Sequence, residues 1–93
     1  MVVYQLVFSQ KWEKDIQKHR KSGQVKLLAK IFTFLEEIEQ TPTTGTGQVE
    51  ALKGFEQRQV YSRRIDKKHR LIYEVFEEDK QVEILSAYGH YED

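Results

Sequence analysis

Apolar residues in the first half of the chain repeat first at the period of a strand and then at the period of a helix. Residues 2–8 are mostly apolar and predict a strand, after which Ser9 can cap a helix. Ser22 and Gly23 break that helix, and a second helix is expected over residues 24–40, before Pro42. The expected apolar stripes are Trp12, Ile16 and His19 in the first helix, and Val25, Leu28, Phe32 and Leu35, widened by Ile31 and Ile38, in the second. The very short break between the helices predicts a helical hairpin.

The last third of the chain predicts three strands, over residues 57–65, 70–76 and 81–88. The connections between them are short and suit antiparallel hairpins. Alternation along the middle strand assigns Leu71, Tyr73 and Val75 to one face. The order of elements predicts an α+β fold in a single domain, residues 1–93. We expect a small antiparallel sheet with an N-terminal strand, and the two-helix hairpin packed on one face.

Composition limits the chemistry that this chain can carry. It has 93 residues and no cysteine, which excludes a disulfide or a thiolate zinc site. It has no apolar run long enough for a signal peptide or a membrane helix, and we expect a cytoplasmic protein that does not engage membranes. The net charge is zero, but residues 51–70 carry seven basic and two acidic side chains, a local charge of +5. Arginine dominates this block, and arginine binds phosphate in a forked geometry, so the block favours an anion-binding face.

Two arginines in this block are expected to face each other. If residues 66–68 form a turn, Arg64 lies opposite Arg70 on neighbouring strands, where like charges destabilise a sheet. An anion between them, such as an RNA phosphate, would relieve the repulsion, and Arg63 is a further guanidinium in the same run. The alternative is that each arginine pairs with one of the many carboxylates. The register alone leaves both interpretations open.

A carboxylate and an imidazole complete the candidate chemistry. Glu50 follows a small-residue loop, and His90 lies near the end of the chain, where it can hold or release a proton near neutral pH. A base, an acid and guanidiniums are the groups needed to cleave RNA through its own 2′-hydroxyl. Lys53 can add positive charge, and Tyr91 can stack on a base. The alternatives without a function are that Glu50 and Lys53 are ordinary surface charges, that His90 is a surface histidine of the C-terminal tail, and that Tyr91 anchors this tail to the core. His19 is interpreted as a packing or surface residue, and His69, at the turn, is a minor candidate for binding phosphate. The scattered histidines predict no metal site.

Three motifs in this order resemble the YoeB/Txe toxins of the RelE superfamily, which belong to type II toxin–antitoxin systems. They are Gly45-x-Gly47-x-x-Glu50-x-Leu52-Lys53, then Tyr61-Ser62-Arg63-Arg64-Ile65 with His69-Arg70-Leu71-Ile72-Tyr73, and finally Gly89-His90-Tyr91. The family often has an arginine where this chain has Tyr88. The resemblance implies a RelE-like fold and a toxin that cuts messenger RNA in the ribosomal A site without a metal or another cofactor.

The same resemblance implies roles for single residues and a set of partners. Glu50 is expected to be the general base, His90 the general acid and Arg70 the residue that stabilises charge on the phosphorus. Lys53, Arg63, Arg64 and Tyr91 are expected to bind the RNA. The partners implied are a cognate antitoxin of the YefM/Axe kind, the ribosome with its message and, in some members, a second copy of the toxin. The competing function is a non-catalytic RNA- or ribosome-binding module on the same fold, which would need the arginines but neither the base nor the acid.

Overall fold

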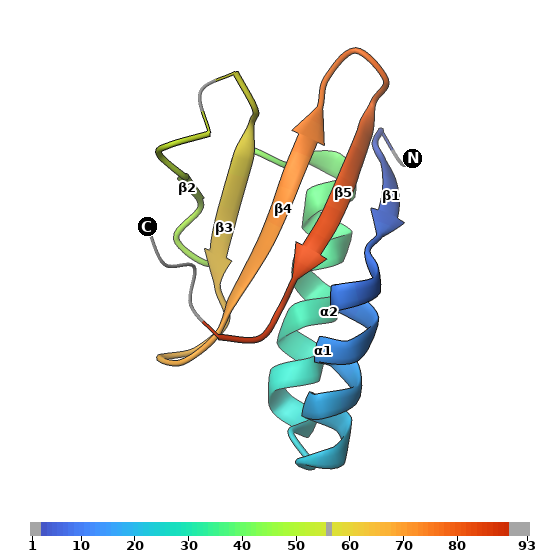
Figure 1. Cartoon of the computed structure of the whole chain (residues 1–93), viewed down its shortest axis with the longest axis vertical. Coiled ribbons are helices and arrows are strands. Elements are labelled where there is room, and N and C mark those ends of the chain that lie inside the picture. The colour runs from blue at the N-terminus through green and yellow to red at the C-terminus, as the bar shows by residue number, and fades with distance from the viewer. Residues whose placement is uncertain (1–2, 56, 90–93) are drawn as a thin grey trace.

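The computed structural model describes residues 3–55 and 57–89, and it contains two helices packed on one face of a five-stranded sheet (Figure 1). The elements in chain order are β1 (Gln5–Phe8), α1 (Gln10–Lys21), α2 (Val25–Gln40), β2 (Glu50–Ala51), β3 (Val60–Arg64), β4 (Arg70–Phe76) and β5 (Gln81–Ser86). The α+β class and the helical hairpin on one face of the sheet are therefore confirmed. Within the described ranges, no helix is both long and apolar enough to cross a membrane.

The strands are ordered β1-β5-β4-β3-β2, so the first and last strands of the chain are neighbours (Figure 1). The pairs β3–β4 and β4–β5 are antiparallel, as their short connections predict, and the pair β2–β3 is antiparallel as well. The pair β1–β5 is parallel, with Gln5 opposite Gln81 and Phe8 opposite Ile84. The expectation of a purely antiparallel sheet is therefore wrong at this edge. No hairpin joins β1 to its neighbour, so turn length does not fix its direction.

The first helix is capped and oriented as its sequence predicts. The Ser9 hydroxyl accepts a hydrogen bond from the Trp12 N–H at 3.1 Å, and it donates one to the Leu85 carbonyl at 2.7 Å. The cap thus fixes both the start of α1 and its position over β5. The expected stripe of Trp12, Ile16 and His19 is buried, and Asp15 is buried with it.

The second helix buries most of the face that the sequence predicts, but the buried face is shifted around the helix. Its buried residues are Ile31, Phe34, Leu35 and Ile38. The predicted stripe residues Val25 and Phe32 are instead 74% and 42% exposed. Ile31, Leu35 and Ile38 belong to the predicted face, whereas Phe34 does not. Contact with the sheet shifts the buried face toward Phe34, because Leu71, Tyr73 and Val75 of β4 belong to the same buried cluster as Ile31 and Phe34.

Candidate active site

The open face of the sheet, opposite the helices, gathers several of the predicted site residues. Glu50 of β2 pairs with Ser62 of β3, and Arg64 of β3 pairs with Arg70 of β4. Residues directly opposite in a ladder point to the same face, and so do residues two apart along a strand. Glu50, Ser62, Arg64 and Arg70 therefore share one face, while Leu71 and its alternates face the helices.

The arginine pair has the register that the sequence predicts. Arg64 and Arg70 lie directly opposite each other, and both are partly exposed. The Nη1 atom of Arg70 is buried and has no hydrogen-bond partner among the described residues. A buried guanidinium donor without an acceptor is costly unless a ligand supplies one. The two arginines thus repel each other, and one of them has a hydrogen-bond donor without an acceptor. A bound anion would reduce the repulsion and accept that hydrogen bond.

The residues that surround this pair differ in exposure. Glu50 opens β2 with an exposed side chain, and Lys53 is exposed just after that strand. The hydroxyl of Ser62, in the ladder position opposite Glu50, is fully buried and has no hydrogen-bond partner within the described ranges. The open face therefore offers an accessible carboxylate on the strand that neighbours β3, and the exposed cation of Lys53 follows it in the chain.

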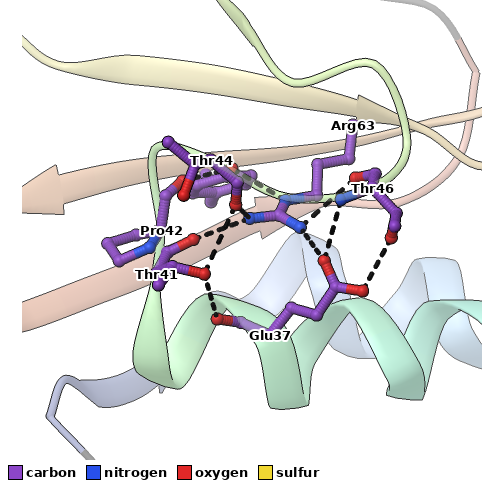
Figure 2. A network of polar contacts seen from close by, with 7 residues as sticks. Glu37, Thr41, Pro42, Thr44, Thr46 and Arg63 are labelled. Atoms are coloured by element: carbon purple, nitrogen blue, oxygen red, sulfur yellow. Dashed lines mark hydrogen bonds and ion pairs between the residues drawn. The ribbon is translucent and has the colours of Figure 1, made fainter.

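Arg63 does not belong to this face. Its side chain is 0% exposed and points toward the helices, where it enters the loop that follows α2 (Figure 2). Its acceptors are Glu37 Oε1 at 2.7 Å, Tyr73 Oη at 3.0 Å and the carbonyls of Thr44 at 2.8 Å, Thr41 at 3.0 Å and Thr46 at 3.3 Å. A guanidinium used in this way has no surface to offer to RNA, so the RNA-binding role expected for Arg63 is wrong. The missed signal was alternation, since Arg63 lies two residues from Tyr61 and Ile65, which both pack with the core.

The Arg63 network fixes the loop that leads to Glu50. Glu37 accepts hydrogen bonds from the Thr46 hydroxyl at 2.7 Å and the Thr46 N–H at 3.0 Å, and these bonds, reinforced by Arg63, lower the pKa of its carboxyl. The Tyr73 hydroxyl donates to the Pro42 carbonyl at 2.6 Å, and burial raises the pKa of that phenol although its contact with Arg63 lowers it. The loop is thereby fastened to α2, β3 and β4 before the chain reaches β2.

The last two predicted site residues, His90 and Tyr91, lie outside the described residues. The described chain ends at Gly89, whose carbonyl accepts a hydrogen bond from the Arg70 N–H at 3.0 Å. The Gly89 N–H donates to Nδ1 of His69 at 2.9 Å. His19 is buried and joins Nε2 to the Ala87 carbonyl at 2.8 Å. The structure therefore brings the segment before His90 to Arg70. Among the described residues, no three histidine, aspartate or glutamate side chains are grouped so that they could hold a metal ion.

The chain is similar to bacterial toxins both in sequence and in fold. Residues 8–91 match the family model described as "YoeB-like toxin of bacterial type II toxin-antitoxin system". Over 66 residues, 71% of this chain and 74% of the relative, it is 39% identical to Toxin YoeB of Mycobacterium bovis.

Solved structures agree with this similarity. The YoeB/ParE toxin from Agrobacterium tumefaciens superposes with a TM-score of 0.83 at 28% identity, covering 94% of this chain and 99% of that chain. The YoeB dimer from Staphylococcus aureus gives 0.80 at 31% identity, with 96% and 99% covered. The YoeB-YefM complex from the same species gives 0.76 at 31% identity, with 95% and 98% covered.

Proposed function

Since the chain belongs to the YoeB-like toxins of bacterial type II toxin–antitoxin systems, we propose that it is a ribosome-dependent endoribonuclease. It cleaves messenger RNA in the ribosomal A site, needs no metal, and so inhibits translation in the cytoplasm. The observation that carries this proposal is the shared open face of Glu50, Arg64 and Arg70, in which the buried Nη1 of Arg70 lacks an acceptor. A phosphate group bound there would supply that acceptor.

The mechanism uses the 2′-hydroxyl of the message as the nucleophile. Glu50 takes the proton from this hydroxyl, and the 2′-oxygen attacks the adjacent phosphorus. Arg70, with Arg64 and Lys53, stabilises the negative charge that develops on the non-bridging oxygens. The bond from phosphorus to the 5′-oxygen breaks, and His90 gives that oxygen its proton. The products are a 2′,3′-cyclic phosphate, which can open to a 3′-phosphate, and a 5′-hydroxyl end.

The accessibility of the carboxylate fits this role for Glu50. It is exposed on a two-residue strand, so a substrate can reach it without rearrangement of the core. The positive charge that accompanies it is local, because the whole chain has no net charge. Phosphate contacts supply much of the affinity of proteins for nucleic acids. We therefore expect weak cleavage of free RNA and efficient cleavage of message that the ribosome presents.

The partners of this chain follow from its relatives. The Staphylococcus aureus relative has been solved both as a dimer and in complex with YefM. We propose that this chain is likewise neutralised by a YefM-like antitoxin and that it can form a homodimer. An antitoxin segment rich in acidic residues would complement the open face and fold as it binds.

The decisive experiment compares Glu50→Gln and His90→Gln with wild type on messages bound to ribosomes. Each proton-transfer group typically contributes about 10²–10⁴-fold, so each variant should slow cleavage by that factor and keep its affinity for the ribosome. Glu78→Gln is the matched control, because this glutamate is exposed in the turn after β4. Message carrying a 2′-deoxy substitution at the cleavage site should resist the wild-type protein, and a chelator should have no effect.

Other outcomes of this experiment would overturn the proposal. Ribosome binding without cleavage by wild type would favour the non-catalytic binding module. Cleavage of the 2′-deoxy message at the normal rate would eliminate attack by the 2′-hydroxyl. Loss of activity with the chelator, restored by one metal ion, would indicate a metal-dependent hydrolase.

A further inference from the structure

Two buried side chains of α1 hold the backbone just beyond β5. Asp15 and His19 lie one helical turn apart, and each residue is only 1% exposed. The Asp15 carboxylate accepts a hydrogen bond from the Ala87 N–H at 2.9 Å, and His19 Nε2 donates to the Ala87 carbonyl at 2.8 Å. Both backbone polar groups of Ala87 are thus bound by side chains rather than by a neighbouring strand. Lys11 Nζ pairs with the same carboxylate, at 2.9 Å from Oδ2 and 3.2 Å from Oδ1.

A second pair of hydrogen bonds holds the chain two residues later. The Gly89 N–H donates to His69 Nδ1 at 2.9 Å, and the Gly89 carbonyl accepts from the Arg70 N–H at 3.0 Å. The His69 N–H in turn donates to Asp66 Oδ1 at 2.8 Å, which fixes the turn that carries this histidine. Gly89 has a φ of +83°, a backbone conformation that favours glycine, so the chain changes direction at this point.

Aromatic contacts fill the space between these two attachments. The ring of Tyr88 lies 5.2 Å from that of His19 and 4.6 Å from that of His69, measured between centroids. The two histidine rings meet edge to face at 4.8 Å, and the Lys18 ammonium lies 4.6 Å from the centre of the Tyr88 ring. Tyr88, the residue that replaces the arginine common in the family, therefore joins both histidines.

The segment after β5 is held by more hydrogen bonds than the end of a strand requires. The last residues of a domain are usually poorly ordered unless they are tied down. Here β5 ends at Ser86, yet residues 87 and 89 are each bound at both the N–H and the carbonyl. The residue after Gly89 is His90, the acid of the proposed reaction. A proton donor must be held within hydrogen-bond reach of the leaving oxygen.

We propose that His69, together with Asp15 and His19, positions the C-terminal segment so that His90 can act on substrate held by Arg70. This inference rests on the proposed function. His69 and His19 are positioning residues, since they act through the backbone that precedes His90. Their hydrogen bonds require different ring atoms: His69 must offer an acceptor at Nδ1, whereas His19 must offer a donor at Nε2.

This difference defines a crossed pair of substitutions. The amide of asparagine places its polar atoms near the Nδ1 position of histidine, and glutamine extends them to the Nε2 position. We expect His69→Asn to keep cleavage within a few-fold of wild type and His69→Gln to lower kcat about 10²-fold with little change in KM, a loss typical of small misplacements. At position 19 the order should reverse, with His19→Gln active and His19→Asn impaired. A role in volume or general packing would not produce this reversal.

Coupling to His90 provides the second readout. In a His90→Gln background, His69→Gln should cause almost no further loss, because residues that act as one unit are strongly non-additive. Losses that multiply in the double variant would overturn the inference, as would a fully active His69→Gln or equal losses in both substitutions at position 69. Thermal unfolding and ribosome binding are measured for every variant. If His19→Asn does not fold, the position-69 pair and the double variant still decide the question.

The same data separate this inference from the proposed function. If His90→Gln cleaves as well as wild type, the proposed mechanism fails whatever happens at position 69. If His90→Gln is impaired while His69→Gln is normal, the mechanism stands and the positioning role is excluded.

Discussion

Replacing Arg63 with methionine tests whether the buried guanidinium is a structural centre of the fold. Arg63→Met keeps most of the length and apolar volume of the side chain but removes every hydrogen bond that it donates. Its ion pair with Glu37, at 2.7 Å, is lost together with the contacts to Tyr73 and to three carbonyls of the loop (Figure 2). Nothing in a methionine side chain can replace these donors.

The size of the effect follows from the exposure of the groups left behind. Removing one partner of a buried ion pair typically costs about 3–5 kcal/mol. The Glu37 side chain is 28% exposed, and the residues that contribute the three carbonyls are themselves exposed, so water can reach part of the broken network. The lower end, about 3 kcal/mol, is therefore expected. For a domain of this size such a loss lowers the unfolding temperature by roughly 12–24 °C.

The measurement is urea unfolding of Arg63→Met beside Arg64→Met. The neighbouring arginine lies on the opposite face of the same strand, is partly exposed and faces another arginine, so its replacement should change the free energy of unfolding by less than about 0.5 kcal/mol. In a Glu37→Gln background, Arg63→Met should lower the free energy of unfolding by less, because no Glu37 carboxylate is then left without its ion-pair partner. A loss below about 1 kcal/mol, or one no larger than that of Arg64→Met, would refute the structural role.

Two further predictions concern the same loop. Gly47→Ala and Gly54→Ala place a side chain at nearly equal φ values of +88° and +89°, but only the new Cβ at Gly47 would come within 2.6 Å of the Phe34 ring. We therefore expect a lower midpoint in urea unfolding for Gly47→Ala than for Gly54→Ala, and equal midpoints would contradict the contact. The folded-state pKa of Glu37 is lowered, chiefly by its bonds from Thr46, so the unfolded chain binds more protons in the acid range. The stability that its carboxylate contributes should be complete above the usual glutamate pKa and disappear as pH falls through the lowered value. In Glu37→Gln, the free energy of unfolding should therefore fall less steeply than in wild type between about pH 6 and pH 3. An equally steep fall in both proteins would argue against a lowered pKa of Glu37.

The antiparallel part of the site was predictable from sequence because local constraints determine it. Residues 66–68 form a tight turn that sets the register of β3 against β4. The observed pairing of Arg64 with Arg70 follows from this register. Alternation then assigns Leu71 and Tyr73 to the core. Such relations depend on residues that are close in sequence.

The parts that sequence reasoning missed depend on contacts between distant residues. The burial of Arg63 requires a partner on α2, 26 residues away, and a charged residue on a strand is otherwise assigned to solvent. The attachment of Ala87 to Asp15 spans 72 residues, and no periodicity relates the two. The direction of β1 is likewise set by its packing beside β5 rather than by any turn.

The neighbouring positions of β1 and β5 have a consequence for biosynthesis. The first strand of the chain pairs within the described sheet only with the last one, and α1 meets Ala87 only after β5 has been made. A nascent polypeptide that ends before β5 therefore has no strand to pair with β1, and contacts of such long range form late. For a toxin whose proposed target is the ribosome, this order of assembly delays completion of the fold until translation of the toxin itself is nearly finished.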